Sequence, residues 1–294
     1  MNILITGAGS GFGELIVRDL LAAGHRVAGS MRDIAGRNAD VAARLAALGV
    51  DVVEIDVTDT ASVDAGVAEA TARLGQIDVL INNAGIGVHG LQEAFTPEDF
   101  RALFEINVFG VQRMIRAVAP AMRARGKGVI VQISSLLGRV ALPFYGPYNA
   151  SKWALEAMTE NYRAELSGFG VEMVVVEPGG FPTGFVANLM HPADGSRDAS
   201  YGPMAAAPAE TLKGFEAFLA DNPQQDPQLV ADAVVGVIAQ PHGARPFRTT
   251  VDTIGMGAAV EGYNTHLAEV TEGLFASLGI EGMLNVALRE DAAA

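Results

Sequence analysis

Short apolar runs alternate with amphipathic segments along most of the chain, and this alternation restricts the fold to few architectures. Apolar strands joined by helices are typical of a parallel sheet that is covered on both faces and connected by right-handed crossovers. We therefore expect an α/β fold, a doubly wound parallel sheet of about seven strands flanked by helices. The runs expected to be strands are Ile3–Ile5, Arg26–Ser30, Val52–Ile55, Val79–Ile81, Val129–Ile133, Val171–Val176 and Arg248–Val251.

The segments between the strands carry Ala, Leu, Arg and Glu at helical spacing, and many end at glycine. A stretch rich in Gly, Pro, Ala and Ser runs from Pro192 to Pro208 and predicts a loop within a substrate lid near residues 181–225. No repeat or linker divides the chain, so we expect a single domain over residues 1–285 and a frayed tail over 286–294. The segments expected to be helices are Glu14–Ala23, Ala39–Leu48, Ala61–Leu74, Phe100–Arg125, Ala150–Phe169, Ala209–Ala220, Asp226–Gln240 and Val260–Leu278.

Composition excludes several classes of function. The net charge of −14 repels phosphate backbones and anionic lipid, so we expect no nucleic-acid or membrane partner. The chain has no cysteine, which excludes disulfides and thiolate metal sites, and its five histidines show no metal-ligand spacing, so we expect no metal. It begins with an apolar strand instead of an export signal, and no apolar run approaches the roughly 20 residues of a membrane span. We expect a soluble, cytoplasmic protein.

A glycine-rich turn lies between the first expected strand and the first expected helix. It reads Thr-Gly-Ala-Gly-Ser-Gly-Phe-Gly over residues 6–13. Glycine lets the backbone approach a diphosphate closely, and the start of the helix adds a partial positive charge, which is why anions bind at such junctions. The turn therefore predicts a nucleotide site, formed by Thr6, Gly7, Gly9, Ser10, Gly11, Phe12 and Gly13.

Tyr148 and Lys152 are four residues apart, which places both on one face if the segment is helical. A nearby cation favours phenolate and lowers the pKa of tyrosine from near 10 toward the range useful for acid–base catalysis. The alternative is a half-buried ring beside a solvated lysine. Ser135 lies thirteen residues before Tyr148, with Ser134 as its neighbour and rival.

The chain resembles the short-chain dehydrogenase/reductase family in the order and intervals of five separated motifs. The resemblance is strong over about residues 1–185, and five motifs together are far more specific than any one. It implies a Rossmann-type fold, hydride transfer between a nicotinamide and a carbonyl or secondary alcohol, and a homodimer or homotetramer. The motifs are the T-G-x-x-x-G-x-G turn from Thr6, Asn82-Asn83-Ala84-Gly85, Ser135, the Y-x-x-x-K pair of Tyr148 and Lys152, and Pro178-Gly179.

The resemblance further implies a catalytic tetrad of Asn107, Ser135, Tyr148 and Lys152. Tyr148 would exchange a proton with the substrate oxygen, while Lys152 would lower the tyrosine pKa and hold the nicotinamide ribose. Ser135 would donate a hydrogen bond to the carbonyl oxygen, and Asn107 would belong to a proton relay at a helix kink. Its alternative role is to satisfy backbone groups within the helix. The implied cofactor contacts are Asp56, Val57, Asn83, Ala84, Gly85, Tyr148, Lys152, Pro178, Gly179 and Thr183.

Cofactor choice depends on the end of the second strand, where an acidic residue would bind the ribose hydroxyls of NAD. The chain has Arg32 there instead. Its guanidinium, assisted by Arg37, would pair with a 2′-phosphate, so we predict NADP(H). If Asp33 neutralises Arg32, use of NAD(H) stays open.

The expected substrate side is mostly apolar, which favours a hydrophobic carbonyl or secondary alcohol. Two other functions are considered: a non-catalytic NADP(H)-binding sensor or scaffold, and a nucleotide-sugar epimerase or dehydratase, whose usual turn is G-x-x-G-x-x-G. The residues expected on the substrate side are Gly87, Val88, His89, Leu137, Pro143, Phe144, Tyr145, Gly180, Phe181 and the segment 186–204.

Overall fold

A parallel sheet with strand order β3-β2-β1-β4-β5-β6-β7 forms the centre of the molecule. The structure, a computed structural model, describes residues 1–288. All neighbouring strands within this range pair in parallel, so the expected doubly wound sheet is confirmed. The strands are β1 (Asn2–Thr6), β2 (Arg26–Met31), β3 (Asp51–Glu54), β4 (Val79–Asn82), β5 (Gly128–Ile133), β6 (Val171–Pro178) and β7 (Arg248–Val251).

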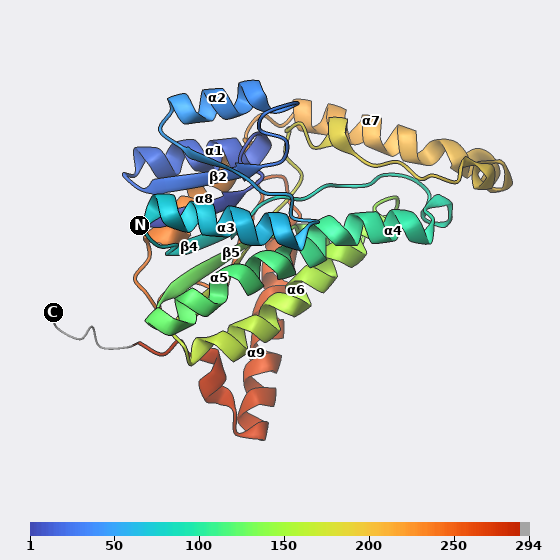
Figure 1. The fold of residues 1–294 in the computed structure, drawn as a ribbon. Coiled ribbons are helices and arrows are strands. Elements are labelled where there is room, and N and C mark those ends of the chain that lie inside the picture. Colours follow the sequence, from blue (N-terminus) through green and yellow to red (C-terminus); the bar gives the residue numbers. More distant parts are fainter. Residues whose placement is uncertain (289–294) are drawn as a thin grey trace.

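Helices cover both faces of the sheet (Figure 1). One core contains Leu20 of α1, Leu45 of α2 and Val234 of α8. The core on the opposite face contains Val67 of α3, Met114 of α5 and Leu155 of α6. Both faces are therefore buried, which is why the strands are apolar without alternation. The helices are α1 (Gly11–Ala22), α2 (Ala39–Ala47), α3 (Thr60–Leu74), α4 (Pro97–Phe104), α5 (Val111–Arg125), α6 (Gly146–Ser167), α7 (Ala207–Ala220), α8 (Gln228–Ala239) and α9 (Gly257–Leu278).

The expected single helix over Phe100–Arg125 is divided into three parts. Helix α4 begins earlier, at Pro97, because Thr96 and Asp99 form a capping box that satisfies backbone groups at its start. A π-helical turn over Glu105–Gly110 then separates α4 from α5. Such turns often occur at functional sites, and this one contains Asn107.

The expected loop over Pro192–Pro208 is more regular than predicted. Short 3-10 turns cover Gly195–Ala206 and lead directly into α7, and the only non-helical residue within them is Gly202, whose φ is 53°. Three consecutive alanines, residues 205–207, explain the regularity, since alanine is the best helix former. Helix α7 and these turns extend to one side of the sheet (Figure 1).

The segment after β6 is attached to the body of the protein. The backbone N–H of Met190 donates to the carbonyl of Gly87 at 2.9 Å, and the N–H of His89 donates to the carbonyl of Met190 at 3.1 Å. At the other end of the chain, the N–H of Ala287 donates to the carbonyl of Ser167 at 2.9 Å. Of the predicted tail over 286–294, residues 289–294 lie outside the described residues.

Helix α1 approaches the end of β1 so closely that position 13 has room only for glycine. A Cβ atom on Gly13 would lie 2.1 Å from the carbonyl oxygen of Gly7 and 2.7 Å from Nδ2 of Asn83. The first of these atoms belongs to the backbone, and the second belongs to an amide that is itself hydrogen-bonded to Gly7. Neither can move away easily to make room for a Cβ atom. Gly13 therefore sets how α1 packs on the end of the sheet.

We expect Gly13→Ala to lower the free energy of unfolding by about 1–3 kcal/mol, because overpacking forces the backbone apart. Urea denaturation followed by circular dichroism measures this change. Gly214→Ala is the matched control: it lies in α7, a Cβ there meets nothing within 4 Å, and alanine favours the helix. Equal stability of the two variants would contradict the close packing at Gly13.

Candidate active site

A cavity of about 880 Å³ opens at the carboxyl ends of the strands, where the chain turns in opposite directions after β1 and β4. Ligands bind at such switch points in open α/β sheets. Of the predicted site residues, Gly13 and Asn107 do not line this cavity and lie behind its wall. Those that do line it are Thr6, Gly7, Gly9, Ser10, Gly11, Phe12, Arg32, Asp56, Val57, Asn83, Ala84, Gly85, Ser135, Tyr148, Lys152, Pro178, Gly179 and Thr183.

Hydrogen bonds join the glycine-rich turn to the Asn-Asn-Ala-Gly segment. The Thr6 hydroxyl accepts from the backbone N–H groups of Asn83 and Ala84, each at 3.1 Å. The Asn83 amide donates to the carbonyls of Thr6 and Gly7, each at 3.0 Å. Gly7 has a φ of 69°, a conformation that glycine adopts without strain. Two motifs far apart in sequence thereby form one continuous wall of the cavity.

Arg32 lies at the far end of the same cavity, together with Arg37 and Asp56. Its Nη1 is 3.9 Å from Oδ2 of Asp56. The Asp33 carboxylate instead accepts from the backbone N–H of Arg37 at 2.9 Å, within its own turn. Burial acts to raise the pKa of Asp56, but hydrogen bonds from Thr58 and the charge of Arg32 outweigh it and hold that pKa below its usual value. The cavity end therefore carries cationic groups beside an ionised carboxylate.

Tyr148 and Lys152 lie in the first turns of α6 and both face the cavity, as the spacing of four residues predicts. The Lys152 ammonium donates to the carbonyl oxygen of Ile133 at 2.8 Å and lies 5.6 Å from the centre of the Tyr148 ring. Ser135 follows β5, and its hydroxyl accepts from the N–H of Leu137 at 3.1 Å. The end of β5 and the start of α6 thus bring the three side chains together.

The pKa of Tyr148 is raised overall, which is the opposite of the net lowering expected from a neighbouring cation. Burial raises the pKa of Tyr148 to about 12, and a hydrogen bond with Ser135 opposes that rise. Burial also lowers the pKa of Lys152 to about 8, which the negative charge of Glu156 opposes. Burial sets the direction of both shifts because both side chains have lost their water, and the Lys152 ammonium is held at the Ile133 carbonyl.

Asn107 is buried in the π-helical turn and is fully engaged with its neighbours. Its Oδ1 accepts from the N–H of Ile86 at 3.0 Å, and its Nδ2 donates to the carbonyl of Ile86 at 2.9 Å. The same Nδ2 lies 3.1 Å from the Ser151 hydroxyl in α6. Asn107 therefore satisfies backbone groups after Asn-Asn-Ala-Gly and ties them to α6.

Sequence reasoning missed two residues that bear on the site. The ring of Phe185 packs against Tyr148 with centroids 5.6 Å apart, and a Cβ on Gly87 would lie 2.1 Å from Cζ of Phe185. No periodic pattern marks Phe185, because it lies in an irregular segment. The second residue is Glu156, which lies one helical turn beyond Lys152 and is almost fully buried. The sequence did offer one indication of Glu156, because a spacing of four residues places its side chain next to that of Lys152 on a helix.

Within residues 1–288, no group of three or more His, Asp or Glu side chains is placed to hold a metal ion. In the same range, no helix is both long enough and apolar enough to cross a membrane.

The family model for short chain dehydrogenases matches residues 1–194 of the chain. The chain belongs to the short-chain dehydrogenase family. The chain is 39% identical over 186 residues to 3-ketodihydrosphingosine reductase of Bacteroides thetaiotaomicron, a match that covers 63% of the chain and 66% of that relative. It is 33% identical over 257 residues to 17-beta-hydroxysteroid dehydrogenase type 1 of Mus musculus, covering 84% of the chain and 73% of that relative.

Solved structures of the family are similar along nearly the whole dehydrogenase. A short-chain dehydrogenase from Streptomyces avermitilis has a TM-score of 0.70 at 29% identity and covers 94% of this chain and 97% of its own. An actinorhodin polyketide ketoreductase solved with NADPH has a TM-score of 0.72 at 29% identity and covers 87% of this chain and 97% of its own. The chain thus belongs to an oxidoreductase family and has the Rossmann-type fold that the motifs predicted.

We expect Thr6→Val to lower the free energy of unfolding by about 1–3 kcal/mol, because it leaves two N–H groups without their acceptor. It should also weaken NADPH binding, since the two walls of the cavity lose their connection. Thr6→Ser keeps the oxygen and serves as the control. Thermal unfolding and fluorescence titration with NADPH measure both effects, and equal losses in the two variants would contradict the role of the hydroxyl.

Proposed function

We propose that the protein is an NADP(H)-dependent reductase of hydrophobic carbonyl compounds, also able to oxidise the corresponding secondary alcohols. The supporting observation is the placement of the Tyr148 hydroxyl, the Ser135 hydroxyl and the Lys152 ammonium in one cavity with the glycine-rich turn. The glycine-rich turn, Asn83 to Gly85, and Pro178 to Thr183 would hold the cofactor. Gly9 and Gly11 line the cavity, where the absence of a side chain would let a diphosphate approach the backbone closely.

The protonation state of Tyr148 favours reduction. With its pKa raised to about 12, the phenol is neutral at pH 7 and holds the proton that a carbonyl oxygen takes up when it becomes a hydroxyl. The Ser135 oxygen accepts from Leu137, and its hydroxyl is hydrogen-bonded with Tyr148, so Ser135 lies beside the phenol, where it would donate to the substrate oxygen once substrate binds. When bound, the nicotinamide supplies the hydride. Lys152, charged below its pKa of about 8, stabilises the negative charge left on Tyr148.

The preference for NADP(H) rests on the cationic end of the cavity. Arg32 and Arg37 both line it, and the Arg32 guanidinium lies 3.9 Å from the Asp56 carboxylate. A guanidinium can form two parallel hydrogen bonds to a phosphate, which favours a cofactor that carries a 2′-phosphate. The similar polyketide ketoreductase was solved with NADPH, which supports the same choice.

The substrate class follows from the side chains around Tyr148. Phe185 packs on the tyrosine ring, and Leu137, Phe144 and Leu189 line the same cavity. Binding there removes apolar substrate surface from water. Two relatives are named for 3-ketodihydrosphingosine and for a 17-beta-hydroxysteroid, which agrees with this class.

We expect Tyr148→Phe to lower kcat for carbonyl reduction at least about 100-fold, since the proton donor is lost, while NADPH binding stays within about twofold. A panel of apolar ketones followed by NADPH absorbance, with fluorescence titration of NADPH, measures both. Tyr145→Phe is the matched control, because Tyr145 lines the same cavity without this role. A wild-type protein that binds NADPH but turns over no ketone or alcohol in the panel would point to a sensor instead.

We expect Arg32→Ala to raise KM for NADPH about tenfold or more, because a charge-assisted pair is lost, and to leave KM for NADH nearly unchanged. Steady-state kinetics with both cofactors and one ketone measure this difference. Arg18→Ala removes an exposed arginine that pairs with Glu14 on α1 and should change neither constant. A wild-type preference for NADH would overturn the assignment.

A further inference from the structure

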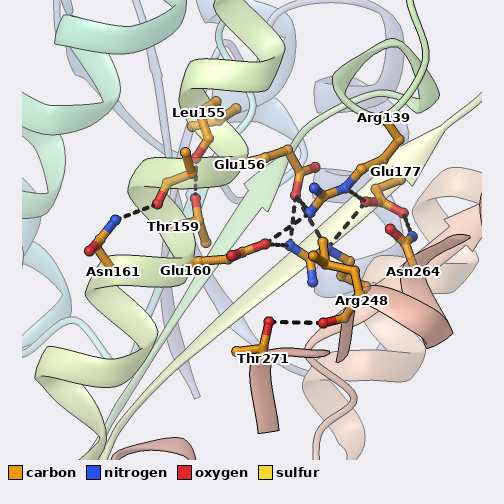
Figure 2. Close-up of polar contacts among 12 residues, drawn as sticks. Arg139, Leu155, Glu156, Thr159, Glu160, Asn161, Glu177, Arg248, Asn264 and Thr271 are labelled. Atoms are coloured by element: carbon orange, nitrogen blue, oxygen red, sulfur yellow. Dashed lines mark hydrogen bonds and ion pairs between the residues drawn. The ribbon is translucent and has the colours of Figure 1, made fainter. Parts of the chain in front are cut away.

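Six polar side chains, four of which are buried, form a charged cluster (Figure 2). Arg139 donates from Nη2 to Glu156 at 2.6 Å and from Nε to Glu177 at 3.1 Å. Arg248 lies 3.4 Å from both of these carboxylates and also pairs with Glu160. Asn264 of α9 donates to Glu177 at 2.5 Å. We call Arg139, Glu156, Glu160, Glu177, Arg248 and Asn264 the buried charge cluster.

The centre of the charge cluster, formed by Arg139, Glu156 and Glu177, is almost dry. The side chains of Glu156 and Glu177 are 1% and 0% exposed, and that of Arg139 is 5% exposed. Removing such charges from water costs several kcal/mol for each ion, and apolar side chains of similar size often give equal or greater stability. Stability alone therefore gives little reason for this arrangement. Its place in the fold suggests another reason.

The charge cluster lies directly behind the elements that carry the proposed catalytic groups. Arg139 is four residues beyond Ser135, Glu156 is one helical turn beyond Lys152, and Glu177 is the residue before Pro178, the last residue of β6. Close packing joins these elements, since a Cβ on Gly138 would lie only 3.1 Å from both Cγ of Glu156 and Oγ of Ser134. The charge cluster thus connects the turn after β5 to α6 and β6.

The charges of the cluster do not balance by themselves. When Glu156 is ionised, three carboxylates face two guanidiniums, which leaves one negative charge in excess. Lys152 precedes Glu156 by four residues on the same helix, a spacing that makes their side chains neighbours. In the described part of the chain, Lys152 has no carboxylate within 4 Å, and its ammonium is held only by the Ile133 carbonyl. The excess charge of the cluster is therefore available to the ammonium.

We propose that Glu156 is a positioning residue whose buried carboxylate, fixed by Arg139 and Arg248, serves as the counter-charge that keeps Lys152 protonated. This proposal rests on the proposed function, in which the charge of Lys152 stabilises ionised Tyr148. Glu156 would act through Lys152 and would touch neither substrate nor cofactor.

The groups that face Glu156 determine when its charge is present. They are Arg139 after β5, Glu177 on β6, Arg248 on β7, and Glu160 and Lys152 on α6. Burial raises the pKa of Glu156 to about 7, an effect that Arg139 opposes. Above pH 7 Glu156 is ionised, and this is the range in which Lys152, with a pKa of about 8, would begin to lose its proton.

The chain offers a direct test because it contains only three lysines, Lys127, Lys152 and Lys213. Protein labelled with ¹³C at lysine Cε gives one NMR signal for each, and its pH titration reports the pKa of Lys152 without cofactor or substrate. We expect Glu156→Gln to lower the pKa of Lys152 by about one unit, since a nearby opposite charge is removed. Glu156→Asp, which keeps the charge, should recover most of that shift.

Glu160→Gln is the matched control. Glu160 belongs to the same cluster and also pairs with Arg139 and Arg248, but its side chain is 33% exposed and lies a further turn from Lys152. Water screens its charge, so the pKa of Lys152 should stay within about 0.3 units of the wild-type value. If Glu156→Gln does not fold, Glu156→Met removes the same charge with a side chain of similar length, and the pKa of Lys152 should again fall.

A second measurement links this titration to turnover. In the folded variant, the alkaline limit of kcat should move to lower pH by the same amount as the pKa of Lys152, whereas a merely structural role would lower kcat equally at every pH. An unchanged Lys152 pKa in Glu156→Gln, or an equal shift in Glu160→Gln, would overturn the proposal. A wild-type protein without turnover would instead contradict the proposed function, and the NMR titration would still decide the role of Glu156.

Discussion

The contact between the ends of β1 and β4 is the constraint on which the rest of the site depends. One hydroxyl, that of Thr6, accepts from two backbone N–H groups of the neighbouring segment, and the Asn83 amide returns two hydrogen bonds. Gly13 lets α1 start directly above this junction. Because the polar groups of the junction satisfy one another, the backbone stays rigid where the strand order reverses. The cavity opens at this point, and α6 then places its first turns against the same edge.

Burial has opposite consequences for the two ionisable groups of α6 that face the cavity. It keeps the Tyr148 phenol neutral and makes the Lys152 ammonium easier to deprotonate, because removal from water disfavours the charged form of each. A neutral phenol suits proton donation, while a neutral lysine would remove the charge that supports the phenolate. The buried charge cluster opposes the effect of burial on Lys152, since it brings an excess carboxylate to the helical turn after Lys152. The geometry of the site and its electrostatics therefore support the same proposed role, in which Tyr148 donates a proton beside a charged Lys152.

The sequence predicted the sheet well because strands buried on both faces are nearly continuous apolar runs. All seven expected runs form strands, with ends that differ by a few residues. The prediction of one helix over Phe100–Arg125 was wrong, since helical periodicity does not report a π-helical turn. Glu156 and Arg139 were missed for a related reason. When the packing of a helix or loop is unknown, a charged residue is expected to be exposed. Their burial follows from contacts with Glu177 and Arg248, which are distant in sequence.

By itself the sequence determined the order of strands and helices, the glycine-rich turn and the spacing that puts Tyr148 and Lys152 on one helical face. These features depend on local backbone geometry and on the periodicity of apolar residues, both of which a sequence contains. Only the tertiary structure decided the direction of the Tyr148 and Lys152 pKa shifts, the packing of Phe185 on the tyrosine and the placement of a carboxylate behind the lysine. The physical reason is that desolvation and charge pairing depend on which distant segments exclude water from a group.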